Sequence, residues 1–278
     1  MKDKKTTILL VIVFFIGLSL LLYPSLSEYW NSFHQTRAIA VYTDKVAKMD
    51  ENQYEEVLES AYAYNAYLAE NKTSWFLTEE EKEVYEQQLN VVGNGIMGYI
   101  EIPSIHCSLP IYHGTNESVL QIATGHIEGS SLPVGGPGTH CAISGHRGLP
   151  SAKLFTDLDK LKEGDYFVIQ VLNEQLTYEV DQIRIVEPDN VTDLVIEKEK
   201  DLCTLITCTP YGINSHRLLI RGSRTDNRPD EYIPVTADAV QIEPRIIAPI
   251  LAIPILLILL IWVFASSRKG KDIRKGAG

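Results

Sequence analysis

The sequence has few cysteines: four in 278 residues, at Cys107, Cys141, Cys203 and Cys208. Four irregularly spaced thiols are too few for the disulfide framework of a small secreted domain, and none forms a CxxC pair of the zinc-binding kind. Nothing else in the chain resembles a metal site, so we expect neither a metal nor a cofactor. Cys107, Cys141 and Cys203 lie in apolar, strand-like contexts, which predicts small buried side chains.

Basic residues are also scarce in the body of the chain. The first five and the last eleven residues hold eight of the 25 lysines and arginines, which leaves 17 basic and 34 acidic side chains between them. A body this acidic would be repelled by phosphates. Binding to nucleic acid is therefore not expected.

Glycine and proline are absent from residues 28–49 and 52–70, and apolar side chains recur there at helical spacing. Two neighbouring helices are predicted. A third, short helix should begin at Thr78, because the run from Thr78 to Glu81 matches a capping box.

Two long runs without charge are present. Residues 6–23 would span about 27 Å as a helix, and residues 246–264 form a second run that Pro249 and Pro254 interrupt. Each run has its basic cluster on the terminal side, so the positive-inside rule predicts cytoplasmic termini and an extracellular body. A cleaved secretory signal is the alternative for the first run, with a possible site at Ser25-Leu26-Ser27. Export follows in either case.

From Gly98 onward the pattern changes to short β-type runs separated by turn residues. The predicted strands are 98–102, 109–112, 140–144, 166–171, 176–186, 202–207 and 217–221, with a hairpin turn at Asn173-Glu174. So many short strands indicate a mainly β fold, either a closed barrel or a sandwich.

Cys208 differs from the other cysteines, because Thr209, Pro210 and Gly212 end its strand. Arg217 begins the next strand and would lie beside Cys208 if the loop between them closes as a hairpin. Its guanidinium would then stabilise an oxyanion or a carbonyl. Taken alone, it would be read as a surface arginine.

Among the seven histidines, His146 is the best candidate for an acid or base partner of this thiol. It lies in a glycine-flanked turn directly after an apolar strand, where a side chain can reach a cleft. His106 and His140 lie in or beside strands and are expected to be structural, and His34 lies on a predicted helix.

These residues resemble the sortase family. The run from Thr204 to Cys208 followed by Arg217 is similar to its active-site motif, and the segment from Thr207 through Leu219 resembles the pilin-polymerising class C enzymes. Residues 145–150 match the family's histidine motif and residues 97–103 its first strand. The resemblance covers residues 27–224, and three separate motifs in the right order make it specific. The two membrane runs also agree with class C.

The resemblance implies a closed sortase β-barrel of about eight strands, with N-terminal helices and two flanking transmembrane helices. It divides the chain into residues 1–26 as a transmembrane helix or signal anchor, 27–95 as an extracellular helical region with a lid-like loop, 96–224 as the catalytic barrel, 225–245 as a linker, 246–264 as a second transmembrane helix and 265–278 as a basic cytoplasmic tail.

In function, the resemblance implies a cysteine transpeptidase that cleaves an LPxTG-like sorting signal and joins pilins through a lysine isopeptide bond. Cys208 would be the nucleophile, His146 the general acid and base, and Arg217 the oxyanion or carbonyl stabiliser. Thr207 is a further candidate for substrate binding or gating. The partners would be pilins or surface proteins that carry the sorting signal, together with the lipid bilayer.

One departure from the family concerns the lid. Class C sortases usually carry an Asp-Pro-aromatic motif before the first barrel strand, and residues 71–97 contain none. Trp75 lies in the corresponding region and is the candidate for an aromatic that covers the thiol.

Two other functions fit parts of the sequence. Ile233-Pro234-Val235-Thr236-Ala237, before an apolar run and a basic tail, loosely imitates a sorting signal, so the chain could be an anchored surface protein. A membrane-tethered barrel that only assists assembly would instead hold an unreactive Cys208.

Overall fold

The computed structural model describes residues 2–71 and 75–227, without the side chains of residues 2–5 and 7. These residues fall into two compact units, one up to Tyr29 and one from Trp30 onward. The linker at 225–245, the second apolar run at 246–264, the basic tail and the segment that imitates a sorting signal lie almost entirely outside the described residues.

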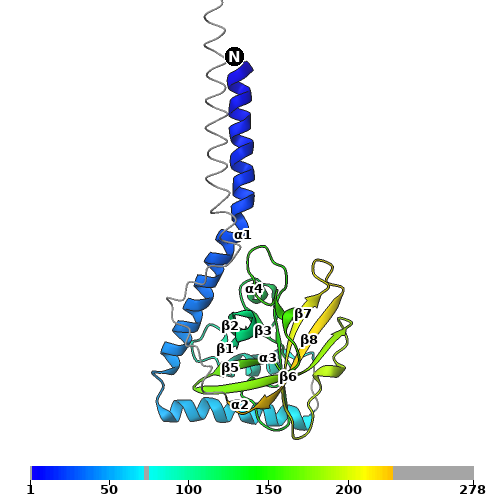
Figure 1. Ribbon diagram of the computed structural model, residues 1–278. Helices are drawn as coiled ribbons and strands as arrows, with labels where there is room; N and C mark the ends of the chain where they lie inside the picture. The colour runs from blue at the N-terminus through cyan, green and yellow to red at the C-terminus, as the bar shows by residue number, and fades with distance from the viewer. Residues whose placement is uncertain (1, 72–74, 228–278) are drawn as a thin grey trace, which may run out of the picture. The chain divides into compact units, whose positions relative to one another are not determined.

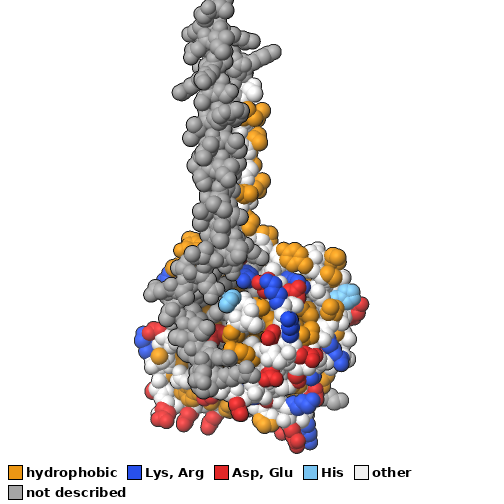
Figure 2. Space-filling model, in the orientation of Figure 1, with side chains coloured by type: hydrophobic (Ala, Val, Ile, Leu, Met, Phe, Trp, Pro, Cys, Tyr) orange, Lys and Arg blue, Asp and Glu red, His pale blue; other side chains and the backbone are white. Residues whose placement is uncertain are grey.

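The first helix, α1, covers Lys2–Val46 and includes Pro24. Within the described residues it is the one helix long and apolar enough to cross a membrane, with a mean hydropathy of 2.5 over its most apolar stretch and none of that stretch buried. The hydrophobic side chains of this stretch are mostly exposed on the surface, and those in view appear in orange (Figure 2). This matches the expected first membrane segment by length and composition.

Two further helices precede the barrel. α2 covers Glu51–Asn71 and α3 covers Glu79–Gln87. The predicted capping box is present, since the Thr78 hydroxyl accepts a hydrogen bond from the Glu81 amide and the Glu81 carboxylate accepts one from the Thr78 amide. The two helices expected from the lack of glycine and proline are present as the second part of α1 and as α2, and α1 continues N-terminally through the apolar stretch.

Eight strands close into a barrel in the order β1-β2-β3-β4-β7-β8-β6-β5 (Figure 1). Pairs β2/β3 and β4/β7 are parallel and the others antiparallel. The strands are β1 Ile96–Ile102, β2 Cys107–His113, β3 Thr124–His126, β4 Thr139–Ser144, β5 Tyr166–Val171, β6 Glu174–Val186, β7 Asp201–Thr209 and β8 His216–Thr225. Of the two architectures that the sequence left open, the barrel is present.

The seven predicted strands are all present, most of them longer than predicted. β3 was missed because three residues give no periodicity. The β5–β6 turn lies one residue earlier than predicted, at Leu172-Asn173, and Leu172 takes a φ of 51°. Glu174 is already the first residue of β6 because it pairs with Val171.

Helices α1 and α2 pack against the barrel within the second unit. Ile39, Tyr42 and Val46 of α1 and Ala61 of α2 belong to the same buried apolar cluster as the barrel interior. The Tyr42 hydroxyl donates to the Met97 carbonyl at 2.9 Å and accepts from the Leu172 amide at 2.7 Å. These bonds fasten the end of α1 to β1 and to the β5–β6 turn.

Candidate active site

Cys208 lies near the end of β7, the strand between β4 and β8. Side chains alternate across a strand, and Cys203 and Leu205 belong to the barrel interior. Ile206 instead belongs to a separate cluster on the opposite face, with Ala142, Leu194 and Leu219. Cys208 shares the face of Ile206, so its half-buried side chain lies on the outside of the barrel.

Arg217 is the strand partner of Cys208. The hairpin between β7 and β8 closes as expected, and the register pairs Cys208 with Arg217 directly. The Arg217 Nη1 donates to the carbonyls of His216 at 3.1 Å and Asn214 at 3.3 Å. Directly opposed residues on antiparallel strands have their side chains on the same face, so the guanidinium and the thiol share it.

His146 follows β4, the parallel neighbour of β7. The Gly145 amide donates to the Ile206 carbonyl at 3.0 Å, and the Thr207 hydroxyl donates to the Gly145 carbonyl at 2.8 Å. The residue before His146 is thereby fixed to the two residues before Cys208. Thr207 is buried, and its hydroxyl is engaged in the hydrogen bond to the Gly145 carbonyl.

The turn that holds His146 requires glycine at two positions. A Cβ on Gly145 would lie 2.7 Å from the Phe155 ring. Gly148 has a φ of +77°, and a Cβ there would lie 2.8 Å from the Tyr211 ring. Tyr211 belongs to the β7–β8 loop, and its ring also contacts the Arg147 guanidinium, 5.7 Å from the ring centroid. Close packing therefore joins the turn after β4 to the loop after Cys208.

A carboxylate that the sequence analysis missed lies beside His146. Glu117 Oε2 lies 3.6 Å from His146 Nε2. Glu117 is the first residue of α4 (Glu117–Leu120). The Asn116 side chain caps this helix by accepting a hydrogen bond from the Val119 amide. A hydrogen bond from Gln121 and the proximity of His146 hold the pKa of the Glu117 carboxyl below its usual value. The Asn-Glu pair could have predicted a helix start, but nothing in the sequence indicates its distance from His146.

Trp75 is half-buried and packs against the cluster on the outer face. We call this set the outer cluster: buried Ala142, Leu194, Ile206 and Leu219, with partly buried Trp75, Ile127, Val186 and Val191. Because Ile206 and Leu219 lie two residues from Cys208 and Arg217 on the same face, the outer cluster that the indole packs against borders the candidate site. Phe76, by contrast, is 90% exposed.

The remaining thiols and histidines occupy other environments. Cys141 and Cys203 are buried as predicted, whereas Cys107 is half-buried. Burial raises the pKa of the Cys107 thiol to about 12 and that of Cys203 well above its usual value.

His140 is buried as predicted, but His106 is exposed at the end of a short 3-10 helix. Among the described residues no group of three His, Cys, Asp or Glu side chains could hold a metal ion.

Comparison with known proteins identifies the barrel. Residues 100–225 match the family model described as "Sortase domain". Over 130 residues the chain is 31% identical to sortase D of Bacillus subtilis, a match that covers 46% of this chain and 63% of that protein.

Solved structures give a closer match. Sortase C1 of Streptococcus agalactiae is 54% identical, with a TM-score of 0.68, and the match covers 69% of this chain and 100% of that one. Sortase C of Streptococcus pneumoniae is 43% identical, with a TM-score of 0.61 and coverage of 69% and 97%. With this fold, this family model and these neighbours, the chain belongs to the sortase family of cysteine transpeptidases and, within it, to class C.

Proposed function

We propose that this protein is a membrane-anchored sortase on the cell surface that cleaves an LPxTG-like sorting signal and joins pilin subunits through a lysine isopeptide bond. The observation that carries the proposal is the direct pairing of Cys208 with Arg217 on the outer face of the barrel. The similarity to S. pneumoniae sortase C, whose structure bears on pilin substrate specificity, supports the choice of substrate.

In the first half of the reaction, Cys208 attacks the carbonyl carbon of the Thr–Gly bond as a thiolate, while its proton is held by the His146 imidazolium. The guanidinium of Arg217 stabilises the negative charge that develops on the carbonyl oxygen. His146 donates a proton to the leaving glycine amine, so the C–N bond breaks and a thioester remains on Cys208.

In the second half, a lysine amine of another pilin attacks the thioester carbonyl. His146, now neutral, accepts the proton that the amine loses, and the C–S bond breaks. The Cys208 thiolate and the His146 imidazolium are regenerated, and the product is an amide between the threonine carboxyl group and the lysine side chain.

We assign Glu117 to the orientation of the imidazole. A histidine ring has two nitrogens, and the carboxylate of Glu117 lies at Nε2. Nδ1 is then the nitrogen available for proton transfer to the glycine amine and from the lysine amine. Thr207 supports the same geometry through its bond to Gly145.

We assign Trp75 to gating of the site. Its indole packs on the outer cluster beside Cys208, although the Asp-Pro that usually precedes such an aromatic is absent. An apolar side chain of the sorting signal would compete with Trp75 for this surface. Replacing Trp75 with alanine should therefore speed alkylation of Cys208, and an unchanged rate would contradict the gating role.

The proposed location is the cell membrane, with the barrel outside. The apolar stretch of α1 has the length and composition of an anchor. The basic residues Lys2, Lys4 and Lys5 before it favour a cytoplasmic N-terminus. The lipid bilayer would thus be one partner and the pilins the other.

The test is a reaction of the full chain, purified in detergent, with a candidate pilin. Mass spectrometry should find a thioester on Cys208 and crosslinks between threonine and lysine. The Cys208→Ala variant should form neither, while His146→Ala and Arg217→Ala should remain folded and lose most activity. Substantial crosslinking by Cys208→Ala would overturn the assignment.

A further inference from the structure

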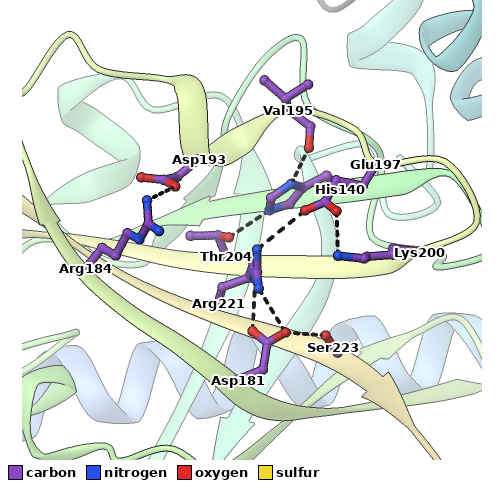
Figure 3. Close-up of polar contacts among 10 residues, drawn as sticks. All are labelled: His140, Asp181, Arg184, Asp193, Val195, Glu197, Lys200, Thr204, Arg221 and Ser223. Carbon is purple, nitrogen blue, oxygen red and sulfur yellow. Dashed lines mark hydrogen bonds and ion pairs between the residues drawn. The ribbon is translucent and has the colours of Figure 1, made fainter.

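The loop between β6 and β7, residues 187–200, is fastened to the outer face of the barrel by polar side chains that the reaction does not use. Figure 3 shows these contacts: the His140 ring lies between Val195 and Thr204, and the Arg221 guanidinium lies between Glu197 and Asp181. His140 belongs to β4 and Arg221 to β8, and Arg184 of β6 adds an ion pair with Asp193 at 2.8 Å, so the loop is held from three strands.

His140 makes the buried part of this attachment. Its Nδ1 lies 2.9 Å from the Val195 carbonyl and its Nε2 lies 2.8 Å from the Thr204 hydroxyl. A carbonyl only accepts, so Nδ1 carries the proton and donates it, and Nε2 accepts from the hydroxyl. Burial lowers the pKa of His140, which favours this neutral form. The imidazole is therefore a fixed strut between β7 and the loop.

Arg221 makes the charged part. Its Nε and Nη2 donate to the two carboxylate oxygens of Asp181 at 2.9 and 3.1 Å, and the Ser223 hydroxyl also donates to Asp181. Burial acts to raise the pKa of the Asp181 carboxyl, but these bonds outweigh it and hold the pKa below its usual value. The third nitrogen, Nη1, lies 3.5 Å from Glu197 Oε1. Because the two bonds to Asp181 fix the orientation of the guanidinium, its Nη1 is preorganised to attract Glu197.

The attached loop forms part of the outer cluster. Leu194 is buried and Val191 partly buried against Ile206 and Leu219, in the cluster that also contains Trp75. Leu194 lies next to Val195 in the chain, so the strut from His140 fixes the backbone beside the buried leucine. The position of the loop therefore determines the shape of the apolar surface beside Cys208.

We propose that His140, Arg221 and Glu197 are positioning residues that hold the β6–β7 loop against the outer cluster and thereby set the affinity for the sorting signal. The inference rests on the proposed function, because it assigns the surface beside Cys208 to the signal. These three side chains would determine KM although none of them belongs to the proposed catalytic set of Cys208, His146 and Arg217.

Distance separates this role from the chemistry. On the paired strands, Thr204 opposes Arg221 and Cys208 opposes Arg217. The two pairs are four residues apart, which is about 13 Å along a strand. Charge effects over this distance are largely screened at physiological salt, where the Debye length is about 8 Å. Loss of the attachment should therefore change binding and leave the chemical step unchanged.

The test compares four variants of the full chain in detergent: Arg221→Ala, Glu197→Gln, His140→Ala and His140→Asn. Arg224→Ala is the matched control, because Arg224 lies on the same strand and bonds to Asp201, Thr177 and Gln175 but not to the loop. Steady-state cleavage of a synthetic LPxTG peptide gives KM and kcat. Hydrogen exchange at the Leu194 amide, which bonds to the Val191 carbonyl, reports the order of the loop.

For Arg221→Ala and His140→Ala we expect faster exchange at Leu194 and a roughly tenfold higher KM, with kcat within about twofold of the wild type. The Glu197 side chain is 42% exposed and tolerates substitution. Glu197→Gln should therefore raise both the exchange rate at Leu194 and KM, but by less than Arg221→Ala does. His140→Asn should recover part of the loss, because its amide can still donate toward Val195. Arg224→Ala should change neither readout.

Two results would overturn the proposal: unchanged exchange at Leu194 in all four variants, or equal rises in KM for Arg221→Ala and Arg224→Ala. A fall in kcat at constant KM would also contradict it, because that would assign these side chains to the chemistry. Failure of the wild-type chain to cleave the peptide would overturn the proposed function instead. The exchange data would then still decide whether these residues hold the loop.

Discussion

Cys203 and Cys208 lie five residues apart on one strand, yet their side chains meet different surroundings. Cys203 is fully buried in the barrel interior, whereas Cys208 is half-buried on the outer face beside Arg217. An odd spacing on a strand puts two residues on opposite faces. The alternation of side chains along the strand thus gives two cysteines of the same strand different surroundings.

Alkylation should reveal this difference. We expect iodoacetamide to modify Cys208 and to leave Cys141 and Cys203 unmodified in the native chain, because the thiolate is the reactive form and must be accessible. Cys107 should react slowly, since burial raises its pKa to about 12. Mass spectrometry of peptides from the labelled native chain measures each site. Comparable labelling of Cys107 and Cys208 would contradict the prediction.

Glu117 is the residue at which the proposed orientation of His146 can be tested. The Glu117→Gln variant should lower kcat/KM by roughly two- to fivefold, because an exposed ion pair contributes little and its loss leaves the imidazole free to rotate. High salt should reduce the difference from the wild type. Glu80→Gln, an exposed carboxylate on α3, controls for net charge. Equal effects of the two variants would remove Glu117 from the site.

At the scale of elements, β4 and β7 together form the candidate site, because β7 carries Cys208 and the turn directly after β4 carries His146. The parallel register pairs Ser144 with Ile206, and Gly145 continues the contact. Phe155 packs over Gly145 and fills the space where a side chain would stand. The position of His146 therefore depends on a glycine and an aromatic ring that take no part in the reaction.

The Gly145→Ala variant tests this dependence. Its Cβ would lie 2.7 Å from Phe155, so the turn or the ring must move. Overpacking of this kind costs about 1–3 kcal/mol. We expect a lower melting temperature and a kcat that falls at least about tenfold, because His146 shifts with the backbone. The double variant with Phe155→Leu should recover part of both, and no recovery would show that the glycine serves another purpose.

The sequence could predict most elements and the three candidate catalytic positions, because these depend on local patterns. Alternation and turn residues indicate seven strands, and the capping box indicates α3. β3 escaped because it is short and is defined by its pairing with β2 and β4. The contacts of Glu117 with His146 and of Arg221 with Asp181 escaped because each joins residues 29 or more positions apart.

At the scale of the whole molecule, two buried histidines link stability to pH. The two ring nitrogens of His113 lie 2.9 Å from the Gly95 carbonyl and 2.8 Å from the Gln88 carbonyl, oxygens that can only accept, and His140 donates to the Val195 carbonyl. Burial lowers the pKa of both side chains below 6.5, and Arg221 acts in the same direction on His140. The folded protein therefore resists protonation that the unfolded chain accepts.

The sign of the effect follows from this difference. Above about pH 7 both states hold neutral histidines, and the full stability is present. As the pH falls through about 6.5 the unfolded chain binds protons first, so the free energy of unfolding falls, by at most about 1.4 kcal/mol per pH unit for each histidine. Burial raises the pKa of Glu101 and Asp201, so these carboxyls contribute with the opposite sign as the pH falls.

Denaturant unfolding of the full chain in detergent at pH 8, 7, 6 and 5 measures this dependence. We expect constant stability between pH 8 and 7 and a progressive loss between pH 6.5 and 5. The His140→Asn variant removes one of the two groups, so its stability should start lower and fall with about half the slope. A wild-type stability that stays constant down to pH 5 would mean that these histidines become protonated inside the fold, and the strut from His140 to Val195 would then have to tolerate a charged ring.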